Sequence, residues 1–393
     1  MAFSTSFGQT FFIAIYAGAW REEFALSHGE WGAIYMVATL SSAAILTQSG
    51  RLADAFRARS VALCLYLGFA LIAVMMAYVT SPLMLAFLVF GLRFCGQGML
   101  SHLAIASMAR WFRARRARAV AIASLGFSAG DAVLPAATVA LIAAIGWRSS
   151  WLVVAALLAL VIAPTLMILL RRERSPRSVA ANTLSPGLGG AQWTRKTMLR
   201  HWLFWALLPG LIGPGWIGTV VFFQIVHLTE VKGWALIDYA GFAYPTYSAC
   251  AVLASFAFGW AADRFGVVRL LPVYLLGWAA GTILMAMAQS LSAGVVALAA
   301  AGIGTGGTSI VMGALFAELY GTRWIGGIKA ITAAVMVLAS ALGPGVSGAL
   351  LDSGVTFEVQ LLAMGLYLLA VSLLFVAVAA RVRPLLPGAV AAM

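Results

Sequence analysis

The stretch Gly50-Arg51-Leu52-Ala53-Asp54 has a near copy, Gly259-Trp260-Ala261-Ala262-Asp263, in the second half of the chain. Both copies share the pattern Gly-x-x-Ala-Asp, and each one separates two long apolar runs. The flanking runs are the second and third of their own half in both cases. A short pattern that recurs at matching points in two series of apolar runs indicates two halves of similar structure.

The composition predicts that these halves lie in a membrane. Of the 393 residues, 63% are apolar and only 9% are charged, whereas about 25% are charged in a soluble domain. So few charges cannot cover a water-facing surface, which excludes a soluble globular enzyme. A membrane-spanning helix needs about 20 apolar residues. The sequence therefore predicts an all-α membrane protein with twelve transmembrane helices, at residues 1–20, 30–49, 60–80, 83–109, 118–145, 149–170, 202–228, 235–258, 268–288, 292–318, 327–350 and 358–380.

Basic residues fix the expected orientation. Nearly all of the 25 Lys and Arg residues lie in the even-numbered connections or after the last run, and cytoplasmic loops are enriched in these residues. We therefore expect a multi-pass protein of a bacterial inner (plasma) membrane with both termini in the cytoplasm. The same placement explains the net charge of +13 without nucleic acid, because the basic residues face anionic lipid head groups. The first run has no basic leader, so we interpret it as a true span rather than a cleaved signal peptide.

The longest connection, residues 171–200, divides the chain into two sets of six spans. It is rich in Pro, Gly, Ser and Arg, which is typical of a flexible tether. The predicted domains are an N-terminal six-helix bundle over 1–170, a cytoplasmic linker over 171–200 and a C-terminal six-helix bundle over 201–393.

The chain resembles the major facilitator superfamily, whose loop signature reads Gly-x-Leu-Ala-Asp-Arg-x-Gly followed by basic residues. The two copies of the repeat match most of this signature. The stretch 111–123, followed by Gly126 and Gly130, is similar to the monocarboxylate and oxalate/formate branch, as is Gly146-Trp147-Arg148. The resemblance implies two pseudo-symmetric bundles that transport a small molecule by alternating access.

The loop signature has a physical interpretation of its own. We expect Gly50 and Gly259 to end their helices with positive φ. An Asp at such a turn can pair with arginines or with a helix N-terminus of the neighbouring bundle, and so hold one side shut. The alternative is that Asp54 and Asp263 are solvated turn residues. The predicted cytoplasmic gate consists of Gly50, Asp54, Arg59, Gly259, Asp263 and Arg264.

Two charges fall deep inside apolar runs, Arg93 in the fourth and Asp131 in the fifth. A lone charge at the bilayer centre costs about 2.5–3.5 kcal/mol, so pairing or a wet cavity is expected. Arg93 heads a polar stripe with Gln97 and Ser101 on one helix face, and His102 lies beside it. Either Arg93 holds an anionic substrate and Asp131 exchanges a proton, or the two form a static ion pair that joins two helices.

In the superfamily, spans one, four, seven and ten line the transport cavity. The resemblance therefore implies lining residues in these spans, to which we add Tyr244 of span eight for its position beside a proline. Relatives in the monocarboxylate and oxalate/formate branch carry a basic residue in span eight and some carry one in span eleven. This chain has no Lys or Arg deep inside either span, so a substrate carboxylate would need Arg93 or neutral donors. The predicted substrate-binding residues are Gln9, Tyr16, Arg93, Gln97, His102, Gln224, Tyr244 and Thr305, with Asp131 and Arg93 as the proton-coupling pair.

These observations predict a monomeric secondary active transporter that couples a small organic anion or metabolite to protons, as in symport. One alternative is a proton-driven exporter of drugs or amphipathic compounds, which neutral aromatic lining residues would also suit. Another is a non-transporting membrane sensor. No cofactor, metal or nucleic acid is expected, and the sequence has neither the His/Cys/Glu spacing of a metal enzyme nor a phosphate-binding loop for ATP.

Overall fold

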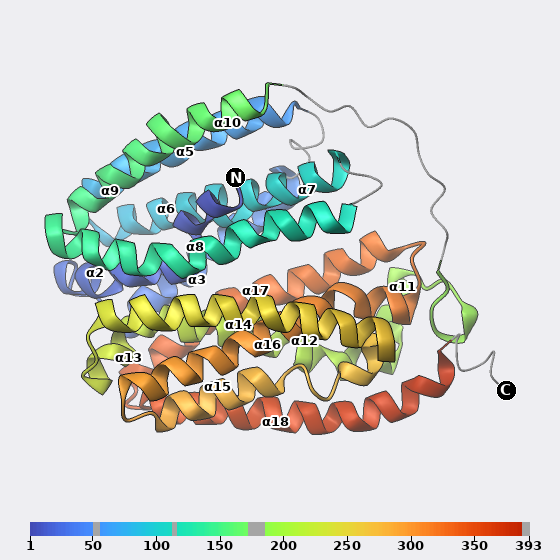
Figure 1. Cartoon of the computed structure of the whole chain (residues 1–393). Helices are drawn as coiled ribbons and strands as arrows, with labels where there is room; N and C mark the ends of the chain where they lie inside the picture. The colour runs from blue at the N-terminus through green and yellow to red at the C-terminus, as the bar shows by residue number, and fades with distance from the viewer. Residues whose placement is uncertain (50–55, 112–115, 172–184, 387–393) are drawn as a thin grey trace. The chain divides into compact units, whose positions relative to one another are not determined.

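The computed structural model describes residues 1–49, 56–111, 116–171 and 185–386. Within these ranges every regular element is helical, and Figure 1 shows long helices joined by short connections. Eight helices or continuous helix series of the described part are long and apolar enough to cross a membrane. The other predicted spans coincide with the interrupted first segment, α3, α14 and the short apolar helix α15. The predicted all-α membrane fold is confirmed, and the structure is consistent with twelve spans.

Spans one to six of the prediction each correspond to one helix or to a series that continues with a local change of winding. The first is divided into four short pieces, and the fourth and sixth each contain a π-helical segment. These elements are η1 (Phe3–Gly8), α1 (Thr10–Ile13), η2 (Ala14–Tyr16), α2 (Ala17–Glu23), α3 (His28–Ser49), α5 (Ala58–Ala77), α6 (Pro82–Leu92), η3 (Arg93–Leu100), α7 (Ser101–Trp111), α8 (Arg116–Ile145), α9 (Trp147–Ala156), η4 (Leu157–Ile162) and α10 (Ala163–Leu169).

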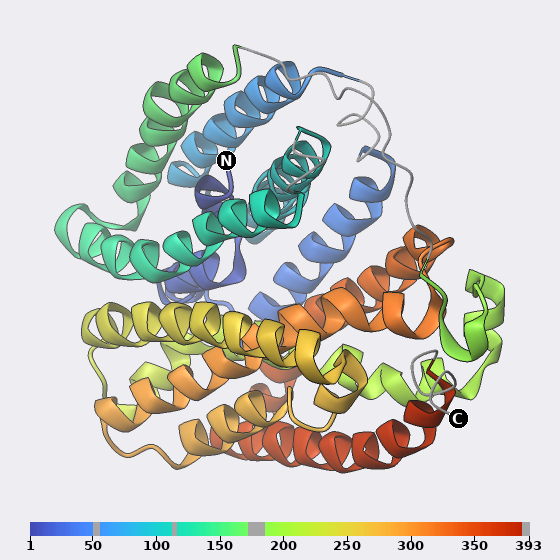
Figure 2. The same ribbon diagram turned by 45° about the vertical axis from the view of Figure 1, so that its right-hand side comes forward.

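Spans seven to twelve likewise each correspond to one helix or to a series of short helical elements. In both views α15 and α18 run side by side, as α5 and α10 do in the first half (Figures 1 and 2). The elements are η5 (Leu188–Gly190), α11 (Arg195–Arg200), α12 (Trp202–Phe223), α13 (Ile225–Lys232), α14 (Leu236–Phe265), η6 (Val267–Leu270), α15 (Leu276–Met287), α16 (Leu291–Tyr320), α17 (Ile325–Asp352), α18 (Phe357–Val382) and η7 (Arg383–Leu385).

One predicted helix end is wrong. Gly259 lies inside α14, which continues to Phe265. The glycine with positive φ is Gly266, at +81°, and its N–H donates to the Ala262 carbonyl at 2.9 Å. The helix continues because nothing at Gly259 competes with the helical hydrogen bonds, whereas Gly266 supplies the left-handed residue that closes a helix C-terminus.

The end of the predicted linker is ordered rather than a simple tether. Residues 185–200 include η5 and α11 and are hydrogen-bonded to the end of α16 and to the residues that follow it. Ser185 N–H donates to Thr322 Oγ1 at 3.0 Å, and Trp193 N–H donates to the Tyr320 carbonyl at 3.0 Å. Thr194 caps α11 by accepting from Thr197 N–H. Prolines and glycines here shape turns that dock the segment, which composition alone does not reveal.

Contacts divide the chain into two compact units that do not follow the sequence halves. The first unit contains 1–179 together with 219–245 and 341–354, and the second contains the remainder. The ends of α12, α14 and α17 thus pack with the N-terminal half, a long-range association that no local pattern signals. The domain boundaries at 171 and 200 stay a prediction.

Candidate functional site

Arg93 lies where the fourth span changes its winding. The α-helix α6 ends at Leu92, and residues 93–100 are π-helical before α7 begins at Ser101. Such wide turns are rare, and they are frequent at functional sites. Because of this change of winding, the polar residues expected to share one helix face at i, i+4 and i+8 differ in their burial. Arg93 is buried, Gln97 and Ser101 are half-buried, and His102 is exposed.

The first span is broken beside Arg93. Gln9 has extended backbone angles (φ −85°, ψ 158°) between η1 and α1. Gly8 and Gly96 approach so closely that a Cβ on Gly96 would lie 2.7 Å from the Gly8 Cα. A helix break frees backbone polar groups, which a membrane protein tolerates only where they are buried in protein or line a cavity. Here the Gly8 carbonyl accepts from Arg93 Nη1 at 3.3 Å.

Neutral groups surround the Arg93 guanidinium. Nη1 is also 3.5 Å from Thr10 Oγ1, and the guanidinium carbon lies 5.0 Å from the centre of the Tyr35 ring. The Tyr35 and Thr10 hydroxyls are hydrogen-bonded at 2.6 Å. The Arg93 side chain is 3% exposed. A buried cation held by one carbonyl, one hydroxyl and an aromatic face is far from neutralised.

Two polar atoms of this cluster remain unsatisfied. Arg93 Nε and Gln97 Oε1 are both buried and lack a hydrogen-bond partner within the described ranges. The static ion pair between Arg93 and Asp131, one of the two alternatives from the sequence, is not among the ion pairs of the described residues. Asp131 is half-buried in α8. The structure thus holds a carboxyl and a guanidinium that do not contact each other in this state.

The other candidates of the first half are dispersed. Gln9 lies at the helix break next to Gly8. Tyr16 instead packs in an aromatic cluster, with its ring centre 4.7 Å from that of Trp151 and its hydroxyl 3.0 Å from Ser150 Oγ. His102 is exposed on α7. Family analogy places Tyr16 on the cavity wall, but the tryptophans around it bury the ring completely.

The candidates of the second half also occupy different surroundings. Gln224 is buried between α12 and α13, with Nε2 3.5 Å from Ser347 Oγ. Tyr244 is buried, and its ring centre lies 6.4 Å from that of Phe11. Both belong to the same compact unit as Arg93, whereas Thr305 lies in the second unit, 3.0 Å from the Tyr247 hydroxyl.

Part of the predicted cytoplasmic gate lies outside the described residues, namely Gly50 and Asp54. Arg59 is exposed in the first turn of α5, and Asp263 and Arg264 are exposed at the end of α14. The Arg264 guanidinium lies over the Trp260 and Phe265 rings, at 5.6 and 5.7 Å. The latch role of these residues stays a prediction.

The structure contains a helix-capping contact that sequence analysis missed. Asp352, the last residue of α17, accepts hydrogen bonds at the start of α3: from Ser27 Oγ at 2.7 Å, from His28 N–H at 3.1 Å and from Gly29 N–H at 2.8 Å. A carboxylate at a helix N-terminus satisfies free amides and the positive end of the helix dipole. Glu30 completes the cap by accepting from Ser27 N–H. We call this contact between α3 and α17 the seal.

Glycines bring the two helices of the seal into backbone contact. A Cβ on Gly32 would lie 3.0 Å from the Gly345 Cα, and one on Gly348 would lie 3.0 Å from the Gly29 Cα. Small residues allow such close approach in membranes. Next to them the His28 and His227 rings are 4.4 Å apart. The distribution of basic residues in the sequence predicts that this end of the spans faces the outside.

Replacing Asp352 by Ala should loosen the seal. Capping interactions contribute about 0.5–2 kcal/mol. We therefore expect the population of molecules in which α3 and α17 are separated at the seal to rise about 2- to 30-fold. The measurement is the distance distribution between spin labels at the exposed positions Glu22 and Val231 in a cysteine-free background. Ser353→Ala is the control, because the Ser353 hydroxyl, directly after α17, donates to the Leu350 carbonyl of that helix and not to α3 within the described residues. Identical distributions for Asp352→Ala and wild type would show that the contact holds nothing shut.

Replacing Gly96 by Ala should destabilise the fold at the site. The added Cβ would meet the Gly8 backbone at 2.7–2.9 Å, and forced overpacking costs about 1–3 kcal/mol. Gly68→Ala is the matched control, because a Cβ there meets nothing within 4 Å and alanine stabilises a helix by about 0.5–1 kcal/mol. Thermal unfolding in detergent compares them, and equal melting temperatures for the two variants would refute the close packing.

Comparisons with known proteins agree with this architecture. The model of the Major Facilitator Superfamily matches residues 1–243 and 237–391. A bacterial homologue of the human lysosomal transporter Spinster, in an inward-facing and unoccupied conformation, is 15% identical over 98% of this chain and 96% of its own, with a TM-score of 0.71. The nucleoside transporter NupG is 15% identical over 96% of each chain, with a TM-score of 0.70. No curated protein sequence matches significantly.

The two structural likenesses show the fold alone, because so little sequence is shared. The family match is broader, since the two matched segments together extend from residue 1 to residue 391. The resemblance to the monocarboxylate and oxalate/formate branch stays a prediction. A multi-pass helical fold and a family match over both halves identify a membrane transporter rather than an enzyme, and the chain belongs to the major facilitator superfamily.

Proposed function

We propose that this transporter moves a small organic anion by alternating access and couples it to protons, as a symporter of monocarboxylate-like substrates would. The observation that carries the proposal is the Arg93 guanidinium, buried and without a carboxylate partner among the described residues. Burying a charge is costly unless it is paired. An anion that binds beside Arg93 would pair this charge and thereby offset the free-energy cost of burying it.

The donor set around Arg93 suits a carboxylate. A guanidinium presents planar donors that match the two oxygens of a carboxylate. Its Nε has no partner, and Gln97 Oε1, also without one, can accept from a hydroxyl or an amine of the same molecule. A broken first span next to the site resembles the discontinuous helices that transporters use for substrate binding. We therefore assign substrate binding to Arg93 and Gln97, with Thr10 and Tyr35 as further neutral contacts.

Tyr35 connects the Arg93 site with the seal. Its ring lies under the guanidinium and 4.9 Å from the centre of the Phe223 ring. Phe223 stacks on Trp31 at 5.5 Å, one turn from the capped start of α3. A change in the position of Arg93 on anion binding would be transmitted by packed rings to the helix that forms the seal. Binding could thereby favour one of the two arrangements that alternating access requires.

Asp131 is the proposed proton carrier. Its carboxyl is half-buried in α8 and has no cation partner within the described part of the chain. A carboxyl in a membrane interior that meets water only in some states gains and loses its proton as access alternates. If a proton moves through Asp131 while the anion moves at Arg93, less net charge crosses the membrane. Transport then requires less electrical work than movement of the anion alone.

The substrate class can be tested on purified protein. We expect small carboxylates such as lactate, formate and oxalate to raise the melting temperature, and their amides to have no effect. The best carboxylate should then show counterflow in liposomes. The exporter reading predicts instead that amphipathic cations or neutral dyes stabilise the protein and carboxylates do not. Stabilisation by a carboxylate without any flux would favour a sensor.

A further inference from the structure

Each half of the chain has a cavity at the same topological position. The first has a volume of about 520 Å³ and lies between the start of α5 and the end of α10. The second has a volume of about 660 Å³ and involves η6 and the end of α18, together with the ends of α14 and α16. Helix α5 is the third span and α10 ends the sixth, whereas η6 begins the ninth and η7 follows the twelfth. The two cavities are therefore equivalent under the duplication, and each lies within one compact unit.

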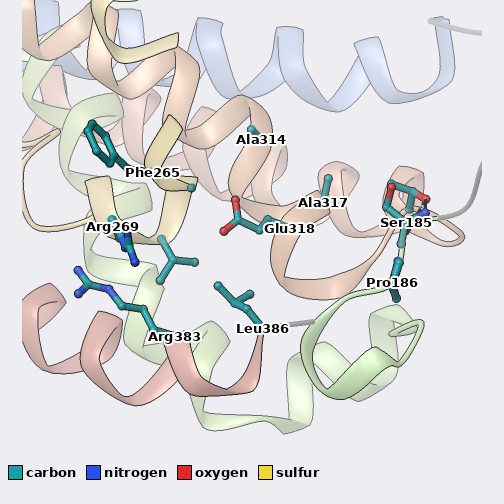
Figure 3. Close-up of a pocket in the computed structure, with 12 residues that line it drawn as sticks. Ser185, Pro186, Phe265, Arg269, Ala314, Ala317, Glu318, Arg383 and Leu386 are labelled. Carbon is teal, nitrogen blue, oxygen red and sulfur yellow. Dashed lines mark hydrogen bonds between the residues drawn. The ribbon is translucent and has the colours of Figure 1, made fainter. Parts of the chain in front are cut away.

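Arginines from the two span ends line both cavities. Arg59 and Arg171, together with Arg57, line the first, and Arg269 and Arg383 line the second. Arg59, Arg171, Arg269 and Arg383 are exposed, and none of these four forms an ion pair with a carboxylate among the described residues. In the second cavity the guanidinium groups of Arg269 and Arg383 lie on the same side (Figure 3). Two like charges placed together without a counter-ion attract an anion.

The second cavity also contains a carboxylate, which offsets one of the two positive charges but forms no ion pair with either arginine among the described residues. Glu318 points into the cavity from α16 (Figure 3), but its Oε2 accepts from Val267 N–H at 3.0 Å. The Glu318 carboxylate thus caps the first residue of η6. The described lining of the first cavity contains no acidic residue. The described residues of both linings therefore carry a net positive charge.

The remaining walls are mostly apolar, with hydroxyl groups from Ser60 in the first cavity and from Ser185 and Thr322 in the second. Leu63, Met167 and Leu170 line the first cavity, and Phe265, Val268 and Leu386 line the second. Leu169 and Leu385, which adjoin the cavities in sequence, are 70% and 51% exposed. Cations beside apolar side chains at the end of a membrane span fit a molecule with an anionic head and a hydrocarbon body.

We propose that these two cavities bind the phosphate head groups of anionic phospholipids. The sign of the charge, the apolar walls and the position at the ends that the basic residues assign to the cytoplasm all favour this ligand. The proposal is independent of the transported substrate, because neither cavity contains a residue of the Arg93 site. A lipid held at both pseudo-equivalent points would fix the third and sixth, and the ninth and twelfth, spans to one another within their own bundles.

The test uses the full-length protein in nanodiscs with equal amounts of phosphatidylcholine and phosphatidylglycerol. Native mass spectrometry counts the lipids that remain bound on release. An arginine near an anionic surface contributes a factor of about five in binding. We therefore expect Arg59→Ala/Arg171→Ala and Arg269→Ala/Arg383→Ala each to weaken phosphatidylglycerol retention at one site about 25-fold.

The control is Arg200→Ala/Arg381→Ala, which removes the same charge from exposed positions that line neither cavity. It should retain phosphatidylglycerol as the wild type does. Equal loss in the control would show that only the overall charge matters and would overturn the proposal. So would wild-type protein that retains both lipids equally. Glycerol 3-phosphate that displaces the lipid at equal concentration would identify a site for soluble phosphates instead.

Discussion

Arg93→Met is expected to make the empty transporter more stable and to abolish anion binding. An unpaired charge at the bilayer centre costs about 2.5–3.5 kcal/mol, and among the described residues the groups that offset the Arg93 charge are the Gly8 carbonyl, Thr10 and Tyr35. Methionine, which is unbranched, apolar and shorter than arginine, removes that cost. Each charge-assisted hydrogen bond to a substrate contributes about 1.5–3 kcal/mol, so affinity for a carboxylate should fall about 100-fold or more. Thermal unfolding and carboxylate counterflow on the same preparation measure both effects.

Arg148→Met is the matched control for this experiment. The Arg148 guanidinium contacts Glu23 and donates to the Ala77 and Val79 carbonyls at 2.8 Å, so its charge is paired. Its loss should lower the melting temperature and leave the carboxylate affinity unchanged. If Arg93→Met behaves in the same way, Arg93 holds helices together and does not bind substrate.

Asp131→Asn is expected to separate exchange from accumulation. If the carboxyl carries the proton, an amide at this position can no longer couple the anion to a pH gradient. Wild-type protein in liposomes with a gradient of one pH unit should accumulate anion about tenfold for each coupled proton. The variant should reach no accumulation and still exchange labelled for unlabelled anion across the membrane.

The control for the proton experiment is Asp238→Asn, since Asp238 is an exposed carboxyl in the first turn of α14. It should accumulate anion as the wild type does. Uphill uptake that persists in Asp131→Asn would assign proton coupling to another group. Loss of both exchange and accumulation, with folding intact, would make Asp131 part of the binding site.

The sequence predicts the fold well because the bilayer imposes a strong local signal. Every span needs a long apolar run, so the helices can be located from hydropathy alone. Helix ends are less certain, as Gly259 and Gly266 show. The positions are similar in sequence, and only the geometry of α14 distinguishes the helical glycine from the one with positive φ.

The site is predictable only where a residue is unusual for its surroundings. Arg93 stands out because a charge inside an apolar run is rare. Thr10 and Tyr35 do not, since hydroxyls are ordinary in membrane helices, yet they contact or underlie the guanidinium. Neither the helix break at Gln9 nor the π-helical turn after Leu92 has a sequence signal. Both lie where Gly8 and Gly96 approach each other closely.

The seal could not be predicted from the sequence either, and the reason differs from that for the Arg93 site. Asp352 and Ser27 are 325 residues apart in the chain, and neither is unusual at a helix end. The Ser27–Glu30 capping box indicates where α3 begins, but not that a carboxylate from another helix completes the cap. A contact of this kind depends on the distance between the ends of two helices that are far apart in the chain. Local sequence patterns carry no information about that distance.

A cryo-EM map of the protein with a bound bromine-substituted carboxylate from the stability screen tests whether Arg93 binds the substrate. We expect density for the carboxylate within hydrogen-bonding distance of the Arg93 guanidinium, with Gln97 beside the remainder of the molecule. Density at another place, with Arg93 still bonded to Gly8 and Thr10 alone, would contradict substrate binding by Arg93.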